Sequence, residues 1–170
     1  VILITGPTAL NTPFGVQAVS VESASEMNGA VMEACKAATV IIMAAAVADY
    51  RPASESTDKL KKDVAAAVSI DLERTTDILS AVPRAIFRVG FAAESSDLVE
   101  NATAKLKSKA LSLVVANDIS QPGIGFDSDD NRVSLIDHAG MTELPVLPKI
   151  DVAHHILDRV AELLSNDRAE

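Results

Sequence analysis

The stretch Val40-Ile41-Ile42-Met43-Ala44-Ala45-Ala46-Val47-Ala48-Asp49 (residues 40–49) decides the fold. Its first four residues form a continuous apolar run, which is typical of a strand buried on both faces of a sheet. The small residues that follow would let a ligand approach the backbone closely, and a carboxylate comes directly after them. Ligands of parallel sheets bind beyond the carboxyl ends of the strands. The stretch therefore predicts a buried strand that leads into a binding site.

Apolar runs alternate with helical patterns on both sides of this stretch. Strands are predicted at 1–4, 16–21, 67–73, 86–91 and 111–116, and helices at 24–38, 96–110 and 149–164. Thr75 or Thr76 can cap a further short helix that runs to Val82. Residues 131–145 predict a β-hairpin that turns at His138–Gly140. The alternation predicts an α/β fold in which a mostly parallel sheet carries helices on both faces, with the hairpin as an extension. No internal linker interrupts residues 1–170, so we expect a single domain.

Charge and composition exclude several classes of protein. Fifteen Lys and Arg against 24 Asp and Glu give a formal net charge of −9, which argues against nucleic acid and against an anionic membrane surface as partners. The longest apolar run, 40–48, falls short of the roughly 20 residues that cross a bilayer. The single cysteine, Cys35, excludes an internal disulfide or a Cys-rich metal site. We therefore expect a cytoplasmic protein.

Two other predicted strands also end in small and then polar residues, Gly90-Phe91-Ala92-Ala93-Glu94 and Ala116-Asn117-Asp118. Lys59 follows the first strand end in an irregular segment, and Lys105 and Lys109 share a face of the next helix because they are four residues apart. In a chain of negative charge, such cations indicate a local anion site suited to a phosphate chain. The alternative, that alanines pack against helices and the charges are merely solvated, stays open on the residues alone. Neither a P-loop nor a Gly-x-Gly-x-x-Gly turn occurs.

Five motifs in one order make the pattern specific. They are Ala44–Pro52, Asp58-Lys59-Leu60-Lys61-Lys62, Gly90–Glu94, Ala116-Asn117-Asp118-Ile119-Ser120 and Gly125–Asn131. Together they resemble the phosphopantothenate–cysteine ligase domain of the bacterial bifunctional coenzyme A biosynthesis flavoprotein, and the similarity runs over nearly the whole chain. The resemblance implies a three-layer Rossmann-like fold, a cytoplasmic homodimer, and a flavin-dependent decarboxylase domain as a fused or associated partner. It implies no FMN in this portion of the protein.

The resemblance also implies an activity. The family joins 4′-phosphopantothenate to cysteine, and CTP with Mg²⁺ first converts the carboxylate into an acyl-cytidylate. Lys59 matches the lysine that is critical for catalysis in the family. The metal-binding group stays unknown, and Asp49 could hold either the cation or a nucleotide hydroxyl. The positions that match the family's CTP site are Met43, Ala44, Ala45, Asp49, Lys59, Thr76, Asp77, Ile78, Leu79, Phe91, Lys105 and Lys109.

The chain departs from the family pattern in two places. The family usually has Asn-Pro-Asp-Ile where this chain has Thr75-Thr76-Asp77-Ile78. The family's domain also begins one strand and one helix earlier, with a glycine-rich turn, so we expect this chain alone to bind CTP and to turn over slowly. Two alternatives to the ligase remain: another Rossmann-like nucleotide-binding protein such as a dehydrogenase, and a non-catalytic dimerisation fragment, because 131–145 resembles the family's dimer-forming region.

Overall fold

A computed structural model describes residues 1–54, 69–94, 97–118 and 128–167 of the chain. The chain divides into two compact units. The first unit holds Val1–Lys36 and Ala45–Ala81, and the second unit holds Ala37–Ala44 and Val82–Glu170. Within the described ranges, no helix is both long and apolar enough to cross a membrane.

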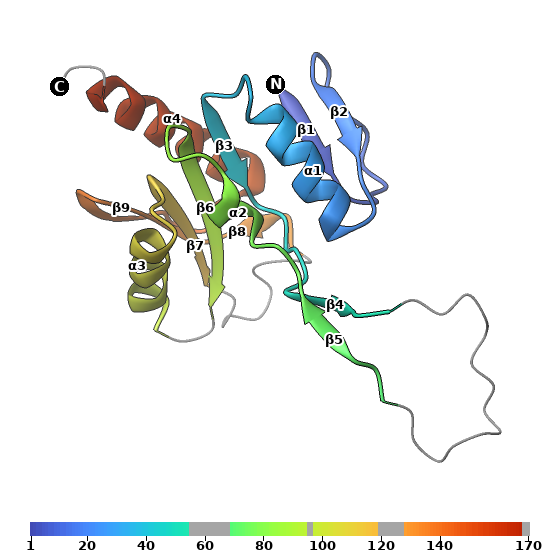
Figure 1. The fold of residues 1–170 in the computed structure, drawn as a ribbon. Coiled ribbons are helices and arrows are strands. Elements are labelled where there is room, and N and C mark those ends of the chain that lie inside the picture. The colour runs from blue at the N-terminus through green and yellow to red at the C-terminus, as the bar shows by residue number, and fades with distance from the viewer. Residues whose placement is uncertain (55–68, 95–96, 119–127, 168–170) are drawn as a thin grey trace. The chain divides into compact units, whose positions relative to one another are not determined.

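In its described residues, 1–36, 45–54 and 69–81, the first unit contains two pairs of short strands and two helices (Figure 1). Strands β1 and β2 pair in parallel, and β4 and β5 pair antiparallel. Helix α1 begins at a capping box, in which Ser23 accepts the N–H of Glu26 and the Glu26 carboxylate accepts the N–H of Ser23. The elements are β1 (Ile2–Thr5), β2 (Gln17–Ser20), α1 (Ala24–Ala34), β4 (Tyr50–Pro52), β5 (Leu72–Arg74) and α2 (Ile78–Ala81).

The second unit is built on a five-stranded sheet in the order β10-β9-β7-β6-β3. Strands β3, β6 and β7 run parallel, and the hairpin of β9 and β10 adds two antiparallel strands. A small antiparallel pair, β8 with β11, lies outside this sheet. The elements are β3 (Val40–Met43), β6 (Phe87–Glu94), α3 (Leu98–Ser108), β7 (Leu113–Asp118), β8 (Asp130–Asn131), β9 (Val133–Asp137), β10 (Gly140–Glu143), β11 (Leu147–Pro148) and α4 (Lys149–Asp167).

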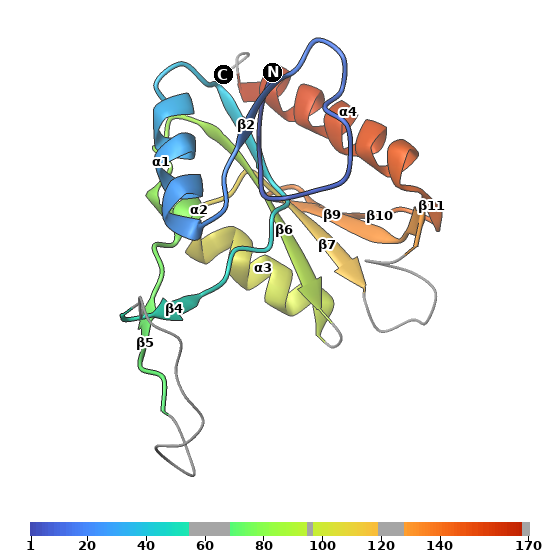
Figure 2. The same cartoon turned by 90° about the vertical axis from the view of Figure 1, so that its right-hand side faces the viewer.

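Helices α3 and α4 cover opposite faces of this sheet (Figures 1 and 2). Alternate residues of the strands pack with α4 in one core, to which the helix contributes Val152, Ile156 and Val160. Ala102 and Leu106 of α3 are buried on the other face. The predicted α/β class, the mostly parallel sheet, the helices on both faces and the hairpin are therefore confirmed. Buried strand residues that share the α4 core are Phe87, Val89, Leu113, Val115, Val133 and Leu135.

Strand β3 is less buried than its apolar sequence predicts. Its residues are half-buried or exposed, and Ile42 keeps 40% of its surface accessible. Helix α3 packs on β6, β7 and β9, one strand or more away from β3. The prediction of a strand buried on both faces is thus wrong for β3 in these residues, whereas it is confirmed for β7, whose Leu113–Ala116 stretch is fully buried.

The C-terminal end of α3 differs from the predicted 96–110 helix. Ala110 lies beyond the helix in the left-handed region, with φ of 47°. The Leu111 N–H donates to the Leu106 carbonyl at 2.9 Å and the Ala110 N–H donates to the Lys107 carbonyl at 3.2 Å. These two bonds form a Schellman motif, in which the left-handed residue ends the helix. Ala110, the last residue of the predicted helix, therefore lies outside α3 and is exposed.

Candidate functional site

Strand β3 of the second unit ends four residues before its parallel neighbour β6. Strand β3 ends at Met43, which pairs with Gly90, whereas β6 continues to Glu94 and pairs with β7 as far as Asp118. The last four residues of β6 therefore have a neighbouring strand on one side only among the described residues. The place where β3 stops beside the longer β6 forms an open step in the sheet. This step is at the carboxyl ends of parallel strands, where such sheets bind ligands. It contains Met43, Ala44 and Phe91, three of the predicted site residues.

Lys105 of α3 contacts the β6 backbone at this step. Its ammonium donates to the Phe91 carbonyl oxygen at 2.6 Å, and the side chain is half-buried. Lys109, one turn later, is the C-cap of the helix and is also half-buried, whereas Lys107 between them is exposed. The structure therefore brings together Phe91 and Lys105, two of the predicted site residues. It also shows a specific contact that the spacing of the lysines did not indicate.

In the first unit, Thr75 holds the segment that carries Asp49. The Thr75 N–H donates to the Asp49 carbonyl at 2.9 Å, and the Thr75 hydroxyl donates to the Ala48 carbonyl at 2.6 Å. Next to this tether, the ion pair of Arg51 with Glu73 joins β4 to β5 at 2.6 Å. The Asp49 carboxylate is exposed. Thr75, which sequence reasoning considered only as a helix cap, is thus a residue that fixes the backbone beside Asp49.

Helix α2 starts differently from the prediction. The Asp77 carboxylate accepts the backbone N–H of Ser80 at 3.1 Å and its hydroxyl at 2.8 Å, so Asp77 caps the helix instead of Thr75 or Thr76. The local sequence explains this, because an aspartate followed three residues later by a serine provides both partners. Ile78 and Leu79 are buried, whereas Thr76 and Asp77 are exposed. Since α2 has only four residues, the interpretation of its start as a ligand contact depends on the family resemblance alone.

The predicted site residues are divided between the two units. Lys59 lies outside the described residues, as do the motif residues Asp58 and Ile119. Among the residues that are described, no group of three or more His, Cys, Asp and Glu side chains is arranged to hold a metal ion. The second unit carries Met43, Ala44, Phe91, Lys105 and Lys109, and the first unit carries Ala45, Asp49, Thr76, Asp77, Ile78 and Leu79.

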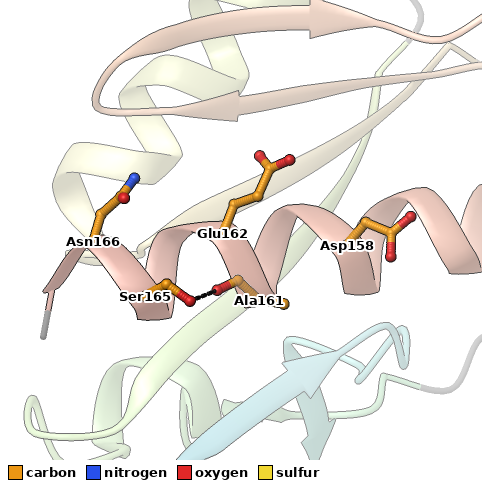
Figure 3. Close-up of a pocket in the computed structure, with 5 residues that line it drawn as sticks. All are labelled: Asp158, Ala161, Glu162, Ser165 and Asn166. Carbon is orange, nitrogen blue, oxygen red and sulfur yellow. Dashed lines mark hydrogen bonds between the residues drawn. The ribbon is translucent and has the colours of Figure 1, made fainter.

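A pocket on α4 is a different feature (Figure 3). Its polar lining is acidic and neutral, and the Ser165 hydroxyl is engaged with the Ala161 carbonyl at 2.8 Å. Glu162 is already paired with Arg159 at 2.8 Å. A surface with two carboxylates and no cation does not suit a phosphate chain. The pocket contains no predicted site residue and is lined by Asp158, Ala161, Glu162, Ser165 and Asn166.

Comparison with protein families finds one match over nearly the whole chain. Residues 1–164 match the family described as the DNA/pantothenate metabolism flavoprotein C-terminal domain. The chain is 39% identical over 171 residues to the coenzyme A biosynthesis bifunctional protein CoaBC of Vibrio vulnificus (strain YJ016), covering 98% of the chain and 43% of that protein. It is also 39% identical over 168 residues to CoaBC of Bacillus subtilis (strain 168), covering 96% of the chain and 41% of that protein. The chain thus spans less than half the length of these relatives.

Solved structures give the same result for the fold. The crystal structure of the C-terminal domain of CoaBC superposes with a TM-score of 0.79 at 38% identity, covering 97% of this chain and 74% of that one. A DNA/pantothenate metabolism flavoprotein from Streptococcus pneumoniae has a TM-score of 0.77 at 20% identity, covering 95% of this chain and 80% of that one, and supports the fold alone. The Rossmann-like architecture is therefore confirmed.

Proposed function

Because the chain belongs to the family of the DNA/pantothenate metabolism flavoprotein C-terminal domain, we propose that residues 1–170 form a CTP-dependent ligase domain that joins 4′-phosphopantothenate to cysteine. The resemblance found in the five motifs is confirmed by this membership. The observation that carries the proposal is the 39% identity to coenzyme A biosynthesis proteins over 98% of the chain. The name of those relatives places them in coenzyme A biosynthesis, and the proposal assigns the ligase step to this chain.

The proposed reaction has two steps. The carboxylate of 4′-phosphopantothenate attacks the α-phosphorus of CTP, and pyrophosphate leaves, which gives the acyl-cytidylate. The amine of cysteine then attacks the acyl carbon, and CMP leaves as the amide forms. Activation is needed because a free carboxylate is a poor electrophile. Negative charge develops on the phosphate oxygens in the first step, so fixed cations near them lower its barrier.

The chain offers groups for each of these requirements. Lys59 is the proposed catalytic cation at the phosphates, and Lys109 adds a second positive charge. The exposed Asp49 carboxylate has two proposed roles: a ligand of Mg²⁺, which typically takes one or two carboxylates together with phosphate oxygens, or an acceptor for a nucleotide hydroxyl. Bound there, Mg²⁺ would supply charge neutralisation for the departing pyrophosphate. The backbone of 43–45, the segment 76–79, Phe91 and Lys105 complete the proposed CTP site.

We also propose the cellular context of this activity. The curated relatives are bifunctional proteins more than twice as long as this chain, so a flavin-dependent decarboxylase domain is the proposed partner, fused or associated. A homodimer is proposed through the β9–β10 hairpin, whose outer strand is exposed along its length. The cytoplasm is the proposed compartment, since the substrates are metabolites of central biosynthesis.

Titration calorimetry with CTP and ATP tests the nucleotide assignment. CTP is expected to bind more tightly than ATP, and Lys59→Ala is expected to lose most of this affinity because a cation at the phosphates is removed. Lys36→Ala is the matched control, since Lys36 is an exposed lysine paired with Glu33 at the end of α1. Equal affinity for the two nucleotides, or an unchanged affinity in Lys59→Ala, would sink the assignment. Binding of NAD in place of CTP would favour the dehydrogenase alternative.

A further inference from the structure

The Phe91 carbonyl lies where β6 loses its β3 partner. The Phe87 N–H donates to the Thr39 carbonyl at 2.9 Å, whereas the Arg88 carbonyl accepts from Ser112 at 2.9 Å on the β7 side. Successive backbone groups of a strand point to opposite neighbours, so the odd residues of β6 direct their N–H and C=O groups toward β3. The pairing with β3 ends at Met43, opposite Gly90. The Phe91 carbonyl therefore lies one position past the last β3 pair.

Lys105 supplies the bond that the ladder no longer provides. Its ammonium reaches the Phe91 oxygen at 2.6 Å, a short distance typical of a charged donor. A half-buried carbonyl without a partner would be unfavourable, and Phe91 also packs against the α4 core through its ring. Both the side chain and the backbone of Phe91 are thus held, one by the core and one by α3.

We propose that Lys105 is a positioning residue, whose ammonium takes the place of a β3 partner and fixes Phe91–Ala93 as the edge on which the nucleoside lies. The identity of the ligand in this proposal rests on the proposed function. The anchoring of Phe91 by Lys105 is independent of the proposed function. Ala93 is two residues along the same edge and is exposed, and its backbone groups face the same side as those of Phe91. A fixed edge binds a flat, polar base with less loss of conformational entropy than a mobile one.

Three variants of the full chain separate positioning from direct phosphate binding. Lys105→Met removes the ammonium and keeps the length of the side chain. Lys105→Arg retains a charged donor that can reach a carbonyl. Lys107→Met is the matched control, because it removes the same charge from an exposed position on the same helix. Hydrogen–deuterium exchange of the ligand-free protein reports on residues 90–93, and calorimetry with cytidine and with CTP reports on binding.

In Lys105→Met, we expect faster hydrogen–deuterium exchange over residues 90–93. We also expect the affinities for cytidine and for CTP to fall equally, each by about tenfold. Lys105→Arg is expected to restore most of both, and Lys107→Met to change neither. A positioning role is overturned if exchange over 90–93 is unchanged in Lys105→Met. It is also overturned if only the affinity for CTP falls, because cytidine has no phosphate and losing a direct phosphate contact would leave cytidine binding unchanged. An equal rise of exchange throughout β7 would also overturn it, since that indicates general destabilisation. If the wild type binds neither ligand while Lys105→Met still frees residues 90–93, the proposed function fails and the anchoring of Phe91 stands.

Discussion

Among the ion pairs in the described part of the second unit, the pair between Asp137 and Arg159 is expected to be the most costly to break, and Arg159→Met tests this. The Asp137 side chain is 4% exposed at the end of β9, and it accepts Arg159 Nε at 2.8 Å and Nη2 at 2.7 Å. Its other oxygen accepts the Ala139 N–H at 2.7 Å in the hairpin turn. Arg159 therefore fastens α4 to the β9–β10 hairpin, and its substitution leaves a buried carboxylate with one bond.

The expected cost follows from burial. Removing one partner of a buried pair destabilises by about 3–5 kcal/mol. Arg159 is 27% exposed, so water replaces part of the lost interaction, and we expect a decrease of about 2–3 kcal/mol in the free energy of unfolding. Methionine keeps the apolar stem, so the change measures the charged group. Hydrogen bonds to Glu162 and Asp137 raise the pKa of the Arg159 guanidinium, so the pair keeps its positive partner throughout the accessible pH range.

Urea unfolding followed by circular dichroism measures the effect, since the chain has no tryptophan. With a slope of about 2 kcal/mol per molar urea, the midpoint should fall by about 1–1.5 M at unchanged slope. Arg132→Met is the matched control, because Arg132, directly before β9, pairs with Glu143 of β10 and the two side chains are 38% and 50% exposed. An exposed pair of this kind contributes less than about 1 kcal/mol. Equal shifts for the two variants would refute the argument that burial decides the cost.

Three smaller changes test local features. Ala110→Gly should raise the free energy of unfolding by about 0.5–1 kcal/mol, measured by urea unfolding, because glycine adopts the left-handed residue of the Schellman motif without strain; a decrease would contradict that geometry. Backbone N–H groups of Glu22 and Ser23 lower the pKa of Glu26 below its ordinary value of 4.5, so the capping box stabilises the fold above pH 4.5 and loses this effect as the pH falls through the lowered pKa. The stability difference between wild type and Glu26→Gln should therefore shrink on acidification, and a difference independent of pH would count against the charged cap. Burial raises the pKa of the Cys35 thiol, so an aromatic disulfide reagent at mildly alkaline pH should react more slowly with the folded protein than with protein in urea; equal rates would show that the thiol is not shielded.

Local periodicity was sufficient for most of the elements. The predicted strand at 40–43 and the hairpin at 131–145 coincide with β3 and with β9–β10. Of the predicted strand at 67–73, residues 67 and 68 lie outside the described part of the chain, and among the described residues β5 covers Leu72–Arg74, which are exposed. Side chains on a strand or helix face repeat with a fixed period, so a single segment contains the signal. How deeply a strand is buried depends on which helix crosses it, which explains why the prediction for β3 was wrong and that for β7 was confirmed.

The sequence by itself determined the α/β class, the order of the elements, the family, and the strand ends at which the candidate site residues lie. Short-range patterns and motifs carry this information, because they need no knowledge of distant contacts. Only the tertiary structure decided that Lys105 bonds to the Phe91 carbonyl and that Thr75 holds Ala48 and Asp49. The first contact depends on where β3 stops beside β6 and on how α3 packs back on the sheet, and the second depends on how β4 pairs with β5. Register and packing are properties of the assembled sheet, so no single segment of the sequence specifies them.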